Sequence, residues 1–192
     1  QEAFTDGLSG LDWAVGIPGT IGGALVMNAG SANDWVGEHV DRVTIYRPGT
    51  GLVAMSGREI DWEYRRSGLD ESGIVVEGTL RTAEGDGIRI RAEMERAFQR
   101  RKESQPVGLP NAGSVFRNPP GACAGQLIEQ CGLKGTRIGG AKVSEMHANF
   151  IVNDAGASAA DYAALVDLVR AAVVEKHGVR LQTEIRYVGA FA

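Results

Sequence analysis

GIPGTIGGALVMNAG, residues 16–30, holds five glycines and one proline around the apolar run ALVM. Glycine has no Cβ, so this backbone can turn sharply and approach a ligand closely. Thr20 is placed to cap a helix that begins near Ile21, and a helix N-terminus presents free N–H groups to anions. The stretch predicts either a backbone cradle for a phosphate-bearing ligand or a tight, glycine-packed turn in the core.

The spacing of these glycines excludes two common nucleotide motifs. The pattern G-x-x-G-x-x-G-G is neither the dinucleotide fingerprint G-x-G-x-x-G nor the P-loop G-x-x-x-x-G-K-[ST]. A Rossmann or P-loop fold is therefore not expected. The chain contains 27 glycines in 192 residues, about twice the ~7% background, which indicates that backbone geometry matters throughout.

Composition limits the class of protein. A hydrophobic content of 43% and a charged content of 23% are ordinary for a globular chain long enough to bury a core. The net charge is −4 and no tract is rich in Lys or Arg, so no nucleic-acid partner is expected. No apolar run approaches the ~20 residues that span a bilayer, so no membrane partner is expected.

The two cysteines, Cys123 and Cys131, lie eight positions apart without a CxxC motif or a neighbouring Cys/His set. We therefore predict no metal site. Both side chains are expected to be free thiols in a reducing cytoplasm.

Periodicity predicts the elements of the first half of the chain. Alternation and β-branched residues predict a hairpin with its turn at residues 47–51, and WEYRRSGL, residues 62–69, is expected to be irregular. The predicted strands are residues 40–46, 52–56 and 73–82, and the predicted helix is residues 88–102.

A domain boundary is expected where prolines gather. Residues 105–120 hold four of the six prolines, which divides the chain into domains 1–104 and 105–192. Ser158 and Asp161 form a capping box at the start of the firmest helix. The second domain is predicted to contain a helix at 122–131, strands at 139–143 and 149–153, a helix at 158–176 and a last strand at 181–188. This mixture favours an α+β fold over regular βαβ winding.

Two polar segments could carry chemistry. Arg65, in Tyr64-Arg65-Arg66-Ser67, could bind a carboxylate or phosphate through its two-pronged guanidinium, or could be a surface arginine stacked on Trp62. Ser114, in NAGSVFRNP, lacks a G-x-S-x-G elbow, so an esterase nucleophile is not expected. It could be a proton or hydrogen-bond donor, or an ordinary turn residue.

A third segment, LQTEIRY, places Glu184 and Arg186 on one face of the predicted last strand. Such a pair fits either a site or a plain surface contact. The tripeptide His147-Ala148-Asn149 also fits either a site or an ordinary surface segment.

Taken together, these segments resemble the UDP-N-acetylenolpyruvoylglucosamine reductase (MurB) family. The segments occur in the order seen in that family: GIPGTIGGALVMNAG, YRRS, PNAGSVFRNP, AGQLIEQCGLKGTRIGGAKVSEMHANFIVN and LQTEIRYVG. The resemblance covers residues 7–189, and the short loop between YRRS and the serine is similar to the second subtype.

The resemblance implies a fold. It predicts the second lobe of a non-Rossmann FAD-binding domain at residues 1–104, followed by an α+β substrate-binding domain at 105–192. The last strand, 181–190, would pack back toward the flavin lobe. The sequence has no counterpart of the family's N-terminal lobe, so we expect it to be part of a longer protein.

The resemblance also implies an activity. The family uses NADPH and FAD to reduce UDP-N-acetylglucosamine enolpyruvate to UDP-N-acetylmuramate, for peptidoglycan precursors, in the bacterial cytoplasm. Two other interpretations stay open: another FAD oxidoreductase of the same superfamily, and a non-catalytic UDP-sugar-binding fragment.

Residue roles follow by matching motifs. Ser114 matches the serine that protonates the substrate carbanion, and Arg65 and Glu184 match the residues that stabilise its enolate-like form. The residues expected to bind FAD are Gly16, Ile17, Pro18, Gly19, Thr20, Gly22 and Gly23. The residues expected to bind substrate are Tyr64, Lys102, Asn118 and His147.

Overall fold

The computed structural model describes residues 1–31, 34–69 and 73–189. The chain forms two compact units, Gln1–Arg100 (unit 1) and Arg101–Ala192 (unit 2). Helices and antiparallel sheets are mixed in the chain, which confirms the predicted α+β class.

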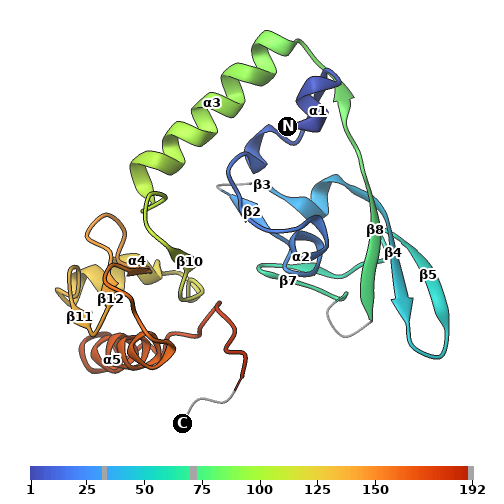
Figure 1. Ribbon diagram of the computed structural model, residues 1–192. Helices are drawn as coiled ribbons and strands as arrows, with labels where there is room; N and C mark the ends of the chain where they lie inside the picture. Colours follow the sequence, from blue (N-terminus) through green and yellow to red (C-terminus); the bar gives the residue numbers. More distant parts are fainter. Residues whose placement is uncertain (32–33, 70–72, 190–192) are drawn as a thin grey trace. The chain divides into compact units, whose positions relative to one another are not determined.

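Unit 1 is built on a three-stranded antiparallel sheet of order β5-β4-β8 (Figure 1). The predicted hairpin is confirmed, because β4 and β5 pair from Arg42–Ser56 to Arg47–Gly51. The elements of unit 1 are α1 (Glu2–Thr5), β1 (Leu8–Ser9), η1 (Asp12–Ala14), α2 (Ile21–Val26), β2 (Gly30–Ser31), β3 (Asp34–Trp35), η2 (Val36–His39), β4 (Val40–Arg47), β5 (Gly51–Ser56), β6 (Trp62–Glu63), β7 (Arg66–Ser67), β8 (Ile74–Leu80), β9 (Ala83–Glu84) and most of α3 (Gly87–Ser104).

The helix that follows the glycine-rich stretch is anchored on the sheet. Leu25 of α2 is fully buried in the core of unit 1. A Cβ on Gly78 of β8 would lie 2.7 Å from Leu25 Cδ1, so glycine at position 78 allows the helix to lie against the strand. This contact fixes the position of residues 16–30 on the unit.

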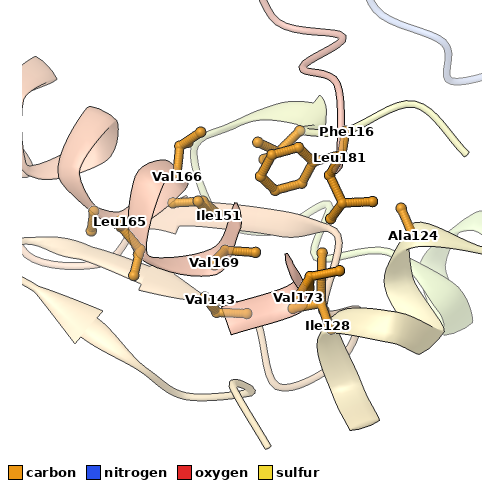
Figure 2. Close-up of a cluster of buried hydrophobic side chains, with 13 residues drawn as sticks. Phe116, Ala124, Ile128, Val143, Ile151, Leu165, Val166, Val169, Val173 and Leu181 are labelled. Atoms are coloured by element: carbon orange, nitrogen blue, oxygen red, sulfur yellow. The ribbon is translucent and has the colours of Figure 1, made fainter. Parts of the chain in front are cut away.

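Unit 2 has a four-stranded antiparallel sheet of order β10-β13-β12-β11. Its elements are β10 (Asn111–Ser114), α4 (Ala124–Gln130), β11 (Arg137–Ile138), β12 (Ala141–Val143), β13 (Phe150–Asn153) and α5 (Ala159–His177). Figure 2 shows the core, in which α5 side chains meet residues of the strands, of α4 and of the C-terminal segment. Phe116 and Leu181, at most 2% exposed, are part of this core.

The capping box predicted for the last helix is present. Ser158 Oγ accepts a hydrogen bond from the Asp161 amide at 3.1 Å, and Asp161 Oδ2 accepts one from the Ser158 amide at 2.9 Å. The bond from the Ser158 amide, together with bonds from the Ser158 side chain and the Gly140 amide, holds the pKa of Asp161 below its usual value, because these donors favour the charged carboxylate. Gly178, with φ of +68°, ends the helix as expected.

The predicted last strand at 181–188 is wrong. In this segment the ladder is reduced to one antiparallel bridge, between Thr183 and Phe116. The segment lies beside residues 115–117, which follow the end of β10 and are not themselves a strand, so no ladder continues along it. Ala190, in the wider range 181–190, is outside the described residues.

Two segments are more regular than their sequences indicate. Residues 62–67, expected to be irregular, form a two-stranded hairpin in which β6 and β7 are joined by Tyr64 and Arg65. Within the proline-rich stretch, β10 pairs with β13 and ends at Ser114.

Candidate functional site

The glycine cradle, residues 16–23, leads into α2. Thr20 is the N-cap of this helix, and its Oγ1 accepts a hydrogen bond from the Gly23 amide at 3.1 Å. Gly16 and Gly19 have φ of +72° and +123°, which L-residues with a Cβ rarely adopt. The predicted cap is confirmed, and the backbone before it has the conformation that needs glycine.

The surroundings of the cradle are compatible with a dinucleotide-sized cofactor. Gly16, Ile17 and Ile21 line a hollow of about 670 Å³ in unit 1. Around Gly19, a built Cβ would meet no described atom within 4 Å. A bare, exposed backbone beside a large hollow fits a phosphate-bearing ligand.

The hairpin of β6 and β7 places Arg65 at its turn. Arg65 has φ of +57°, and its guanidinium lies 5.1 Å from the centre of the Tyr64 ring. Its Nη2 donates a hydrogen bond to the Gly30 carbonyl at 3.1 Å. The ring under the guanidinium is that of Tyr64, whereas one of the two interpretations of this arginine expected Trp62.

A cavity of about 240 Å³ opens beside this turn. It joins the hairpin to the segment that follows α2, so both the glycine-rich stretch and Arg65 contribute to it. The residues around it are Asn28, Gly30, Ser31, Asp34, Trp35, Trp62, Glu63, Tyr64 and Arg65.

In unit 2, Ser114 and Glu184 come from segments 70 positions apart and lie on neighbouring backbones. The Glu184 amide donates to the Val115 carbonyl at 2.8 Å, and the Arg117 amide donates to the Gln182 carbonyl at 2.9 Å. Ser114 is the residue before Val115, and Gly113, at φ of +79°, precedes it in β10, where the register with β13 shifts. The backbone of Glu184 is therefore bonded to the residue that follows Ser114.

Asn149 holds the opposite edge of Val115 and Phe116, the two residues that follow Ser114. Its Oδ1 accepts from the Phe116 amide at 2.9 Å and its Nδ2 donates to the Phe116 carbonyl at 2.8 Å. Its own carbonyl accepts from the Val115 amide at 2.8 Å. The side chain is 4% exposed, so these bonds are shielded from water.

His147 belongs to the same group of residues. Its Nδ1 accepts a hydrogen bond from the Asn149 amide at 3.1 Å, and its ring meets the edge of Phe150. A Cβ on Gly125 would lie 2.9 Å from His147 Cε1, so the first turn of α4 packs directly on the imidazole. Burial lowers the pKa of His147, because it disfavours the charged imidazolium.

Asn118 lies at the start of the loop into α4. Its Oδ1 accepts a hydrogen bond from the Ala124 amide at 3.0 Å, which ties this loop to the helix beside His147. Ser114, Asn118, His147 and Glu184 thus share one connected region of unit 2. Lys102 is exposed in the last turn of α3, and Arg65 belongs to unit 1.

Two buried asparagines of these sites were not among the predicted site residues. Asn28 follows the apolar run of the glycine-rich stretch, and Asn149 precedes a buried strand. In both, an amide side chain stands next to a strongly apolar sequence, where a buried polar group needs partners. That local contrast is the signal that could have identified them.

Other features of the chain add no site. No helix in residues 1–31, 34–69 and 73–189 is long and apolar enough to cross a membrane. Over the same residues, no three His, Cys, Asp or Glu side chains are grouped to hold a metal ion. Cys123 and Cys131 are free thiols.

Comparison with known proteins relates this chain to a family. Residues 105–188 match the family model of the UDP-N-acetylenolpyruvoylglucosamine reductase C-terminal domain. The UDP-N-acetylenolpyruvoylglucosamine reductase of Synechococcus sp. is 47% identical over 100% of this chain and 64% of its own length. That of Moorella thermoacetica is 46% identical over 98% of this chain and 63% of its own length.

A solved structure agrees with the sequence relatives. The crystal structure of UDP-N-acetylenolpyruvylglucosamine reductase (MurB) from Thermus caldophilus matches with a TM-score of 0.85 and 37% identity. The match covers 97% of this chain and 66% of that chain. The chain spans slightly less than two thirds of the length of these relatives. It belongs to the UDP-N-acetylenolpyruvoylglucosamine reductase (MurB) family.

Proposed function

We propose that this chain forms part of an NADPH-dependent flavoenzyme that reduces UDP-N-acetylglucosamine enolpyruvate to UDP-N-acetylmuramate, a step of peptidoglycan precursor synthesis in the bacterial cytoplasm. The observation that carries the proposal is the pairing of residues 115–117 with 182–184, in which the Glu184 amide bonds to the carbonyl of the residue after Ser114. Family membership supplies the substrate and the direction of the reaction.

The glycine cradle is proposed to hold the pyrophosphate side of FAD. Gly16 and Gly19 would let the backbone approach the cofactor, and Thr20 would keep the start of α2 in place. FAD, when bound, supplies the hydride that originates from NADPH. The role of this chain is then to bind the substrate, stabilise its charge and deliver a proton.

Arg65 is proposed to stabilise negative charge on the substrate. Hydride addition at one alkene carbon leaves a carbanion at the other, delocalised into the adjoining carboxylate. A guanidinium can bind that carboxylate through two parallel hydrogen bonds, which an ammonium cannot. A donor that meets developing charge is typically worth ~10²–10³ in kcat.

Ser114 is proposed to protonate this carbanion. An alcohol is a weak acid, so it gives up a proton only to a strong base, and its placement decides its efficiency. The pairing of β10 with β13 before Ser114 and the bonds from Asn149 to Phe116 after it hold the backbone on each side of Ser114. Glu184, on the neighbouring backbone, is proposed to polarise the reacting alkene or to hold the geometry in which the proton is delivered.

Tyr64, Lys102, Asn118 and His147 are proposed to bind substrate. The lowered pKa of His147 keeps its imidazole neutral, so it would act as a hydrogen-bonding group rather than as a cation. Lys102, exposed and cationic, suits the diphosphate of a UDP-sugar.

The test is steady-state NADPH oxidation under anaerobic conditions by the full-length protein that carries this chain. We expect oxidation only when UDP-N-acetylglucosamine enolpyruvate is present, with an equal amount of UDP-N-acetylmuramate formed. Oxidation at the same rate without the UDP-sugar would favour another FAD oxidoreductase. A colourless protein that binds the UDP-sugar but oxidises no NADPH would favour a non-catalytic binding fragment.

A further inference from the structure

Three hydrogen bonds join residues 26–30, the end of α2 and the segment after it, to the hairpin that carries Arg65. Ser67 Oγ donates to the Val26 carbonyl at 2.9 Å, and Asn28 Nδ2 donates to the Glu63 carbonyl at 2.9 Å. Arg65 Nη2 donates to the Gly30 carbonyl at 3.1 Å. Each bond joins a side chain to a main-chain oxygen across at least 35 positions, so together they fix the two segments to each other.

Asn28 is the most constrained member of this set. It is 5% exposed, and it uses both ends of its amide, because Oδ1 accepts from the Gly37 amide at 3.0 Å while Nδ2 holds the hairpin. Its φ is +43°, in the left-handed region that asparagine tolerates better than most residues. Because both ends of this buried amide are bonded, Asn28 holds the Gly37 amide and the Glu63 carbonyl in one fixed arrangement.

Arg65 needs such a support. Among the described residues, Asn28 and Arg65 are the non-glycine residues with positive φ. A positive φ is unfavourable for an arginine, so the residues around this two-residue turn must hold it in that conformation. The bond from Asn28 to the Glu63 carbonyl lies two residues before Arg65, and the bond from Ser67 lies two residues after it.

We infer that Asn28 is a positioning residue for Arg65: its buried amide holds the β6–β7 turn so that the guanidinium faces the 240 Å³ cavity at the end of the glycine-rich stretch. The inference rests on the proposed function, in which Arg65 binds the substrate carboxylate. Asn28 itself contacts the backbone and acts through Arg65. The same residues that shape the cofactor segment therefore set the geometry of the charge-stabilising group.

The experiment is a double-mutant cycle on kcat in the full-length enzyme, with Asn28→Asp and Arg65→Lys. Aspartate keeps the oxygen that accepts from Gly37 but cannot donate to the Glu63 carbonyl. We expect Asn28→Asp to lower kcat about tenfold, within the range of coupling between groups of one network, and to change KM for NADPH little. In the Arg65→Lys background the same change should lower kcat less than about twofold.

Ser67→Ala provides an independent variant if Asn28→Asp folds poorly. It removes the donor to the Val26 carbonyl without adding a charge, and its kcat effect should also shrink in the Arg65→Lys background. Ser9→Ala is the matched control, because Ser9 Oγ donates to the Ala83 carbonyl at 3.1 Å elsewhere in unit 1. Its effect on kcat should be negligible in both backgrounds.

The outcomes separate this inference from the proposed function. If Arg65→Lys lowers kcat but Asn28→Asp and Ser67→Ala cost the same with either residue at 65, the positioning role is wrong and the function stands. If Arg65→Lys turns over like the wild type, the proposed role of Arg65 fails, and Asn28 has nothing to position. A purely structural role of Asn28 would lower thermal stability without the non-additive loss of kcat.

Discussion

The backbone amide of Glu184 donates a hydrogen bond to the carbonyl oxygen of Val115, 2.8 Å away. This bond joins the C-terminal segment to the residue that follows Ser114. The two segments meet where β10 ends, and one bridge between Phe116 and Thr183 takes the place of a continuous ladder. The predictions below test what this region and the glycine cradle do.

Ser114→Ala should nearly abolish turnover of the enolpyruvyl substrate, because the carbanion then lacks its proton donor, while NADPH consumption in the first half-reaction should be unchanged. Loss of a placed proton donor costs ~10²–10⁴-fold. Stopped-flow absorbance separates the two half-reactions. Ser104→Ala, at the exposed end of α3, is the control. A wild-type rate of reoxidation by substrate in Ser114→Ala would remove Ser114 from the mechanism.

Gly22→Ala should weaken FAD retention without lowering stability. A Cβ at Gly22 would lie 3.8 Å from Val75 Cβ, an ordinary contact, and alanine is a better helix former by about 0.5–1 kcal/mol. Any loss of FAD would therefore come from the close approach of the cofactor to the backbone. The measurement is the FAD dissociation constant beside the melting temperature.

Gly87→Ala is the matched control for this substitution, because it is another open helical position, with no atom within 4 Å of the added Cβ. It should leave FAD binding unchanged. Unchanged FAD affinity in Gly22→Ala would instead support the interpretation of the cradle as a structural turn.

The stability of unit 2 should fall as the pH drops below about 6.5, the ordinary pKa of histidine. The pKa of His147 is lowered in the folded state, so over this range the unfolded chain binds more protons than the native one and the unfolding free energy decreases. Urea unfolding at a series of pH values measures the slope.

His147→Asn keeps an acceptor for the Asn149 amide and removes the titration. The variant should show a shallower slope between pH 7 and pH 5, a window of about two units below and around the histidine pKa. Equal slopes in the two proteins would mean that His147 does not contribute to the acid sensitivity.

Asn149→Ala should destabilise the protein by about 2 kcal/mol or more, because it leaves the buried amide and carbonyl of Phe116 without partners. Asn153→Ala is the control: Asn153 is exposed, and its Oδ1 accepts one bond from the Ala157 amide. Its cost should be about 1 kcal/mol or less. Equal losses in chemical denaturation would show that the Asn149–Phe116 bonds contribute little.

Local sequence signals predicted the elements that are stabilised by contacts between residues close in the chain. Thr20 and Ser158 cap their helices because their hydroxyls satisfy amides within the first turn. The β4–β5 hairpin follows from alternation across a short turn. These features depend on contacts between residues close in the chain.

The misses depend on contacts between distant residues. Residues 181–188 alternate like a strand, but a strand forms only where it can pair with the edge of another strand. This segment lies beside residues 115–117 and forms a bridge there at Thr183. The hairpin around Arg65 is held by Asn28 and Ser67, whose partners lie at least 35 positions away. Spacing within a motif cannot reveal such bonds, so the roles of Ser114 and Glu184 came from the family resemblance.

The most direct test of the proposed function is a single turnover in the full-length protein. The enzyme with bound flavin is reduced by one equivalent of NADPH without oxygen, and UDP-N-acetylglucosamine enolpyruvate is then added. The account predicts that the oxidised flavin absorbance returns as one equivalent of UDP-N-acetylmuramate forms, measured by mass spectrometry. A flavin that stays reduced, with the enolpyruvyl substrate recovered unchanged, would contradict it.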